Sequence, residues 1–268
     1  MMNLLHYDFF FNAMLAIIII AAASAVIGTY IVTRRLVAIS GGITHACFGG
    51  LGLGYFLGLS PVAVAAAVAV VSGMAVEWMS GRGRVREDSA IGVIWSLGMA
   101  AGVVFVFLTP GYVPELNTFL FGNILTVNRA DLIVFGLFTA SLIGFYLSMR
   151  RVVVACAFDR DFARTIHLPV GLVNTVMMVF ISVGIVLTIR LVGIMLLMAM
   201  FTLPQLTAEI FARRFDGIML LSGALSILCG VGGLLLATVI DVPCSALIVL
   251  LQASLYFVCR VAGALTNR

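Results

Sequence analysis

Long apolar runs, separated by short polar or proline-containing stretches, make up most of this chain. Roughly 20 apolar residues cross the hydrocarbon core of a bilayer as a helix. These runs are apolar on every face, whereas the strands of a membrane β-barrel alternate polar and apolar residues. The pattern therefore predicts an all-α polytopic membrane protein with about nine transmembrane helices. The predicted spans are 9–33, 38–58, 61–80, 89–109, 131–149, 169–189, 191–203, 217–239 and 243–260.

Two of the apolar runs have unusual ends or an unusual length. The run 191–203 is short and follows a break near Arg190, so it can be a tilted or half-inserted helix that continues the run before it. Eight spans is therefore the alternative count. The first run follows acidic rather than basic residues and ends at Arg34 and Arg35. That order differs from a cleaved signal peptide, and we expect this run to be the first span.

Composition excludes a water-soluble protein. The chain of 268 residues is 63% hydrophobic and 10% charged, and its mean hydropathy is +1.23, whereas soluble domains carry about 25% charged residues. The basic residues gather at the ends of spans, so no nucleic-acid surface is predicted. The five cysteines are scattered without a CxxC pair, which argues against structural zinc and a disulfide framework.

The distribution of arginine orients the spans, because short loops rich in arginine stay in the cytoplasm. All the arginine-rich loops fall on one side if the N-terminus lies outside and the C-terminus inside, with an odd number of crossings. With eight crossings the last two loops would change sides. The residues concerned are Arg34, Arg35, Arg82, Arg84, Arg86, Arg150, Arg151, Arg160, Arg164, Arg213, Arg214, Arg260 and Arg268.

Two loops are long enough to have structure of their own. The outer loop 109–130 contains Pro110, Pro114 and an apolar stretch, and we expect a short amphipathic helix on the membrane surface. The inner loop is the most polar segment of the chain, and it predicts a cytoplasmic helix between Asp159 and His167.

A stripe of small residues follows the second span. Its members recur every four residues and so share one side of a helix, where they allow close approach of a neighbouring helix within lipid. We expect helix packing at these positions, which are Gly42, Ala46, Gly50, Gly54 and Gly58.

His45 lies beside this stripe, where it should face protein or a cavity. An ionisable residue inside a membrane is a candidate for function, and neutral imidazole is a common metal ligand. The alternative is a histidine that only hydrogen-bonds a neighbouring helix. Gly41 and Gly49 occupy the adjacent turns, so a metal would need ligands from other helices or from a second copy of the chain.

Two further ionisable residues stand inside or between spans. For Glu77 we expect a side chain that reaches toward the membrane interface. For Arg190 we expect a polar break between two spans.

Several segments resemble one family, the permease subunits of ATP-driven zinc, manganese and iron importers of the ABC class. The resemblance covers most of the chain, in order, and each motif alone is weak. The segments are "SGGITHACFGGLGLG" (40–54), "REDSAIGVIWSLGMAAGVV" (86–104), "LFGNILTVNRADL" (120–132), "AFDRDFARTIHLPVGLVN" (157–174) and "RLVGIMLLMAMFTLPQLTAEIFARR" (190–214). It implies a single permease domain over 1–268 in a bacterial cytoplasmic (inner) membrane. It also implies a homodimer, so that two His45 rings can act as a pair.

One residue departs from the family pattern. The family has an aspartate four residues before the histidine, and this chain has Gly41 there. Without that carboxylate, we expect low affinity for manganese, which prefers oxygen ligands, and a better fit to zinc or ferrous iron. The resemblance implies a transported divalent ion, zinc, manganese or iron, and no stably bound cofactor.

The chain contains no Walker A motif, so ATP hydrolysis must come from separate subunits. We expect the ATPase to dock on the cytoplasmic segment 204–216, through Gln205, Glu209, Arg213 and Arg214; the alternative is 157–168. A metal-loaded extracytoplasmic binding protein would dock on the outer loop and on the "DVP" turn at 241–243.

Two other classes of function are alternatives to an importer. A gradient-driven secondary transporter needs acidic residues at the bilayer midplane and broken helices, and the spans are poor in acidic residues. An intramembrane enzyme needs a catalytic constellation such as HExxH, GxSxG or paired intramembrane aspartates, and the sequence contains none.

Overall fold

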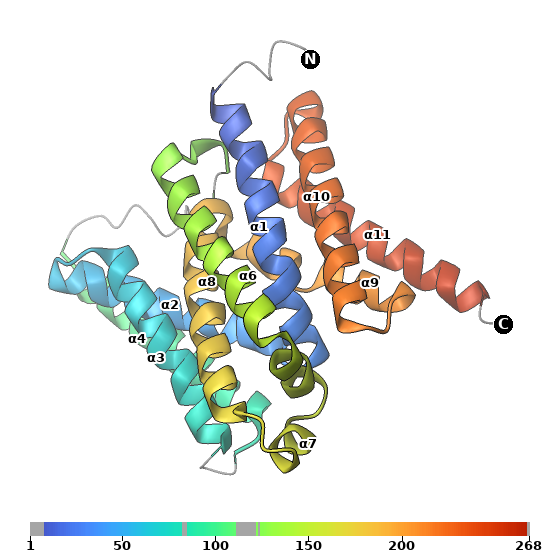
Figure 1. Ribbon diagram of the computed structural model, residues 1–268. Coiled ribbons are helices and arrows are strands. Elements are labelled where there is room, and N and C mark those ends of the chain that lie inside the picture. Colours follow the sequence, from blue (N-terminus) through green and yellow to red (C-terminus); the bar gives the residue numbers. More distant parts are fainter. Residues whose placement is uncertain (1–7, 82–84, 111–121, 123, 267–268) are drawn as a thin grey trace. The chain divides into compact units, whose positions relative to one another are not determined.

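The computed structural model describes residues 8–81, 85–110, 122 and 124–266, and every regular element among them is a helix (Figure 1). Eight of these helices are long and apolar enough to cross a membrane. The prediction of an all-α polytopic membrane protein is therefore confirmed. Most of the predicted outer-loop helix falls outside the described residues. The elements are α1 (Asp8–Thr33), α2 (Ala38–Leu57), α3 (Pro61–Gly81), α4 (Glu87–Leu108), η2 (Ile124–Thr126), α6 (Arg129–Phe158), α7 (Arg160–Thr165), α8 (Val170–Met200), α9 (Leu203–Phe211), α10 (Phe215–Ile240) and α11 (Cys244–Thr266).

The predicted sixth and seventh spans belong to one interrupted helix. Gly193 breaks α8 with φ 79° and ψ 171°, a conformation that is open to glycine and strained for other residues. Eight long helices is therefore the observed number among the described residues, which was the alternative count.

The chain divides into two compact units. Unit 1 comprises 1–33, 118–148 and 190–268, and unit 2 comprises 34–117 and 149–189. The long helices α6 and α8 contribute to both units, and each has a non-helical residue at or near the passage, Met149 and Gly193. A single permease domain over the whole chain stays a prediction.

In unit 1, α1 and α10 run antiparallel in close contact. A Cβ added at Gly230 would meet the side chain of Ile17, and one added at Gly223 would meet Ala25. Small residues on α10 thus let the largely buried α1 approach closely, as expected for helices that pack within lipid.

One end of unit 1 gathers the start of α1, η2 and the start of α6. Asn12 donates to the carbonyl of Val127 at 3.4 Å, and Arg190 pairs with Asp131 at 2.9 Å. Gly122, at φ +60°, lies directly against the backbone of Val192. The glycine of the "LFGNIL" segment is therefore the residue that allows this loop to lie against the break in α8. Arg190 pairs with Asp131 within the helical part of α8, and the break lies at Gly193 rather than at Arg190, where it was predicted.

The opposite end of unit 1 contains the start of α10 and the last turns of α9 and α11. Tyr146 donates to Asp216 on α10, and a Cβ at Gly263 would meet Ile210 at 3.2 Å. The break at Gly193 lies at the end of unit 1 that contains η2, and α10 starts at the opposite end. The chain between them thus passes from one end of the unit to the other. The start of α1 and the end of α11 lie at opposite ends of unit 1.

In unit 2, α2 packs between α3 and α4 on two different rows of small residues. Toward α4, a Cβ at Gly42 would meet Ile91 at 2.6 Å and one at Gly49 would meet the carbonyl oxygen of Gly98 at 2.7 Å. Toward α3, Gly50 and Gly54 lie as close to backbone atoms. The predicted close packing of the second span is present in the structure.

Gly58 is an exception to the predicted stripe. It ends α2 in the left-handed conformation, with φ 65° and ψ 23°, and a Cβ there would meet nothing within 4 Å. Its role is to cap the helix, where glycine is favoured because it has no Cβ, and packing was the wrong prediction.

Candidate functional site

His45 lies on α2 against two side chains of α4. Its ring stacks on Trp95 with 4.5 Å between the ring centroids and 17° between the planes. Its Nδ1 lies 3.1 Å from the sulfur of Met99. The ring is half-buried, so part of it remains accessible within unit 2.

The contact between α2 and α4 places these three side chains together. A Cβ at Gly98 would collide with Ala46, the residue that follows His45. This close approach of the two backbones places two side chains of α4 beside the imidazole. Trp95 lies about one turn before Gly98, and Met99 follows Gly98 directly. The glycines therefore determine the surroundings of the histidine.

The donor set around His45 is nitrogen and sulfur rather than oxygen. Gly41 is buried and supplies no carboxylate. Among the described residues, no group of three or more His, Cys, Asp or Glu side chains could hold a metal ion. A cation at His45 would meet imidazole nitrogen and thioether sulfur, which suit soft and borderline metals. The remaining ligands would come from water or from a second chain.

A charged network lies at the end of unit 2 where α3 ends and α4 begins. Arg34 donates to Glu87 at 2.9 Å and to Asn174 at 3.4 Å. Arg160 reaches the same Glu87 carboxylate at 3.3 Å and Glu77 at 3.8 Å. Glu77 therefore has a charged partner inside the unit, rather than only reaching for the interface.

The network is partly shielded from water. The side chain of Arg34 is 6% exposed and that of Glu77 is 15% exposed. Burial lowers the pKa of Arg160, and the neighbouring Arg34 and Arg164 lower it further, while Glu87 and Glu77 raise it. The two glutamates thus offset the cost of bringing two guanidinium groups together, and they tie α7 and α8 to the hairpin of α3 and α4.

The predicted cytoplasmic helix is present as α7. The carboxylate of Asp159 accepts from the backbone N–H groups of Asp161 and Phe162, which is the usual way to cap a helix start. Phe162 is 58% exposed and Ile166 is 49% exposed. This helix therefore presents an exposed, partly apolar face.

The first residues of the predicted docking segment 204–216 are buried, and its later part is mostly exposed or intermediate. Gln205 is fully buried, and its amide donates to the carbonyl of Ser24 at 2.9 Å. Gln205 as an ATPase contact was the wrong prediction, because its side chain has no access to a partner. Glu209, Arg213 and Arg214 are exposed.

Sequence reasoning missed Trp95, Met99 and Asn174 as neighbours of the predicted residues. Trp95 and Met99 lie four residues apart and so share one face of α4. That spacing was visible in the sequence, but nothing in it gave the register of α4 against α2.

Comparisons with known proteins agree with this architecture. A probable metal transport system membrane protein of Chlamydia pneumoniae is 36% identical over 238 residues, covering 87% of this chain and 81% of the relative. The manganese transport system membrane protein MntC of Halalkalibacterium halodurans is 30% identical over 257 residues, covering 95% and 87%.

A solved structure has the same fold. PsaBC from Streptococcus pneumoniae, in complex with Fab, superimposes with a TM-score of 0.83 at 24% identity, covering 96% of this chain and 93% of the other. The family described as the ABC 3 transport family matches residues 6–263. With nearly its whole length matched, this chain belongs to the ABC 3 transport family.

Proposed function

We propose that this chain is the permease subunit of an ATP-driven importer of a divalent metal, with zinc as the favoured substrate and manganese or iron as the other candidates. The observation that supports it most is His45, a half-buried imidazole beside a thioether within a chain of a metal transport family. Relatives are named for manganese and for iron transport, which supports a metal substrate and leaves its identity to experiment.

In this proposal His45 is a transient ligand on the route of the ion. The stacked Trp95 ring restricts the imidazole, and the Met99 sulfur offers a second weak contact. Two neutral ligands hold a divalent ion less tightly than a carboxylate pair would, so the ion can leave again. A homodimer would bring a second His45 to the same route.

The ATPase partner would dock on α7 in preference to segment 204–216. The face of α7 is exposed, and Arg160 at its start pairs with Glu77 on α3 and Glu87 on α4. Helix α4 in turn carries the residues that surround His45. A movement of α7 caused by the ATPase would therefore be transmitted to the surroundings of His45 through contacts inside unit 2.

The other partners follow from the same proposal. A metal-loaded binding protein would approach the side of the bacterial membrane opposite the ATPase, near the outer loop and the turn at 241–243. The chain would supply no catalytic residues, because hydrolysis of ATP takes place in the separate subunit.

Reconstituted uptake with competing metals tests this proposal. The complex in proteoliposomes should take up zinc only with the ATPase and ATP, and an excess of manganese should compete weakly. His45→Ala should lower zinc uptake about tenfold or more, the loss expected for a ligand in a metal site. Uptake at the original rate would remove His45 from the mechanism. Uptake driven by an ion gradient without ATP would favour a secondary transporter, which the family membership does not favour.

A further inference from the structure

The imidazole of His45 has two ring nitrogens, and their surroundings differ. Nδ1 lies 3.1 Å from the sulfur of Met99. Within the described part of the chain, Nε2 has no hydrogen-bond partner. The ring is half-buried, and Trp95 stacks on one of its faces with 4.5 Å between the centroids. The two nitrogens are therefore not equivalent as ligands for an ion.

The contact with sulfur favours one tautomer of the ring. A neutral imidazole carries one proton, and the hydrogen bond made by one nitrogen determines which of the two holds it. The sulfur of a methionine accepts a hydrogen bond and has no proton to donate. An unprotonated Nδ1 would therefore face the lone pairs of Met99 at 3.1 Å and be repelled. The geometry favours a proton on Nδ1, which leaves the lone pair of Nε2 free.

Two side chains of α4 together fix the orientation of this ring. The stack with Trp95, with 17° between the planes, limits how far the imidazole can tilt. It still allows two orientations that differ by a half-turn of the ring. The sulfur of Met99 selects the one in which Nδ1 faces it. In that orientation Nε2 is on the side of the ring away from the sulfur.

We propose that Nε2 of His45 is the nitrogen that receives the ion, and that Trp95 and Met99 are positioning residues for it. Histidines that bind metals usually donate their other N–H to a partner, which fixes the tautomer and the ring. In this chain the partner is the sulfur of Met99. The inference rests on the proposed function, because it takes His45 as a ligand on the route of the ion.

A thioether partner suits a ligand that has to release its ion. A carboxylate that accepts the Nδ1–H makes the imidazole a stronger ligand. The sulfur of Met99 is only a weak acceptor, so it orients the ring and strengthens the ligand little. Methionine is flexible, and the sulfur can contact the ion itself only after it turns away from Nδ1.

Nuclear magnetic resonance of the full chain in detergent, labelled with ¹⁵N-histidine, tests the tautomer without transport. The chain has three histidines, and the signals of His45 are those that disappear in His45→Gln. At a pH well above the ordinary pKa of histidine, Nδ1 should have the chemical shift of a protonated nitrogen. Nε2 should have that of an unprotonated nitrogen. The opposite assignment would overturn the proposal.

Addition of ¹¹³Cd²⁺ identifies the ligand atom, because only a nitrogen bonded to the metal shows a coupling with it. The coupling should appear at Nε2 of His45. Coupling at Nδ1 would overturn this inference and leave the proposed function intact. Coupling at neither nitrogen would also overturn it, and metal uptake by the reconstituted complex then decides the proposed function separately.

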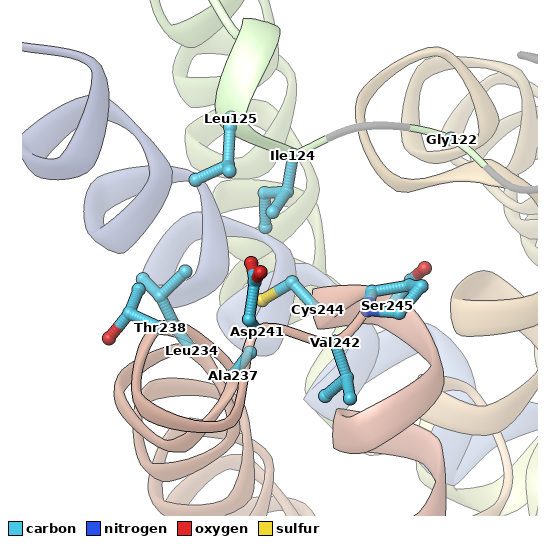
Figure 2. A pocket seen from close by; sticks show the side chains of 11 residues that line it. Gly122, Ile124, Leu125, Leu234, Ala237, Thr238, Asp241, Val242, Cys244 and Ser245 are labelled. Carbon is cyan, nitrogen blue, oxygen red and sulfur yellow. The ribbon is translucent and has the colours of Figure 1, made fainter.

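Cysteine thiols bind Cd²⁺ as well, so the partly exposed cysteines are replaced by serine in every sample. These are Cys244 and Cys259. Cys244 lines a pocket of about 370 Å³ between η2 and the turn that follows α10 (Figure 2). Cadmium that binds there is thus removed from the measurement.

Met99→Leu tests the role of the sulfur. It conserves volume and removes the acceptor of the Nδ1–H, so the protonated Nδ1 should no longer dominate. The affinity of His45 for Cd²⁺ should fall about tenfold, as is typical when the partner of a metal-binding histidine is lost. Met74→Leu, at another exposed methionine of unit 2, should change neither quantity. An unchanged tautomer in Met99→Leu would overturn the role of Met99.

Trp95→Leu tests the stack in the same way. It keeps an apolar side chain beside His45 but removes the indole plane, so the ring should exchange between its two orientations and bind Cd²⁺ more weakly. Trp78→Leu is the control, because Trp78 is exposed on α3. Thermal unfolding shows that each variant is folded. A tautomer and an affinity that are both unchanged in Trp95→Leu would exclude Trp95 as a positioning residue.

Discussion

At Gly98 the backbones of α2 and α4 come into direct contact, so a single methyl group there should be costly. A Cβ would collide with the backbone of Ala46, and overpacking of this kind costs about 1–3 kcal/mol. Gly98→Ala should therefore lower the midpoint of thermal unfolding. Circular dichroism of the purified chain in detergent measures this.

Gly92 on the same helix is the matched control. A Cβ there would meet nothing within 4 Å, and alanine is a better helix former than glycine by roughly 0.5–1 kcal/mol. Gly92→Ala should leave the midpoint unchanged or raise it. Equal destabilisation by both substitutions would show that the α2–α4 contact is looser than its geometry indicates.

Met99 should tune the choice of metal rather than the stability of the chain. Met99→Leu conserves volume and keeps an apolar contact with His45, but it removes the sulfur that lies 3.1 Å from Nδ1. Uptake of zinc should fall relative to uptake of manganese, which gains little from a thioether. A competition assay in proteoliposomes gives the ratio, and an unchanged ratio would exclude Met99 from the route.

At the residue scale the sequence predicted the position of His45 beside small residues, and the structure agrees. It could not predict that Trp95 and Met99 are its neighbours, because periodicity gives the faces of one helix and not its register against another. Gly58 was misassigned for a related reason, since a glycine that ends a helix falls on the same four-residue spacing as one that packs.

Helix α9 shows how polarity can mislead at the level of an element. Its sequence looks amphipathic and suited to a surface, yet Gln205 is fully buried and donates to Ser24. Within a protein interior, a buried amide N–H group that finds a backbone carbonyl is tolerated. The polar pattern alone therefore does not distinguish a helix that docks a partner protein from a helix that packs against the rest of its own chain.

The contact of α9 with α1 depends on Gly28. A Cβ at that position would lie 2.5 Å from the amide nitrogen of Gln205 and 2.8 Å from the carbonyl oxygen of Phe201. Gly28→Ala should destabilise the chain, and Gln205→Ala added to it should recover part of the loss, because the larger side chain is removed. Groups in contact commonly couple by about 0.5–3 kcal/mol, and strictly additive unfolding midpoints would contradict the contact.

The network around Glu87 makes a testable link between α7 and α4. Glu87→Gln weakens its pairing with both Arg34 and Arg160. Because the carboxylate is 29% exposed, the loss of stability should be only about 1–2 kcal/mol. In the complex, ATP hydrolysis should continue while metal uptake falls, since the link to the helix beside His45 is weakened.

Asp88→Asn is the control for this experiment, because Asp88 is the exposed neighbour on the same first turn of α4. It also removes one negative charge from the helix start, but it leaves the network intact. Uptake should stay near its original level. Equal loss of uptake in both variants would show that the charge of the helix start, rather than the tie to Arg160, matters.

For the whole molecule, the arginine distribution and the length of the apolar runs left the number of crossings to the structure. Run length alone left eight and nine crossings open, because 191–203 is too short to decide. The charge bias favoured an odd number, whereas eight helices among the described residues are long enough to cross, and the assignment of sides stays a prediction. The sequence could not show how the short run crosses, since the break depends on the positive φ of Gly193 and on Gly122 packed against Val192.

The same geometry makes a prediction for the intact bacterial membrane. If the arginine-rich loops are cytoplasmic, the C-terminus should lie inside, and the turn that contains Cys244 should lie outside. A fluorescent protein that folds only in the cytoplasm should fluoresce when fused after Arg268, and alkaline phosphatase, active only outside, should be inactive there. A membrane-impermeant maleimide should label Cys244 in intact cells when the other four cysteines are replaced by serine. Active phosphatase at the C-terminus would reverse the assignment of sides and place the turn of Cys244 in the cytoplasm, where no binding protein could reach it.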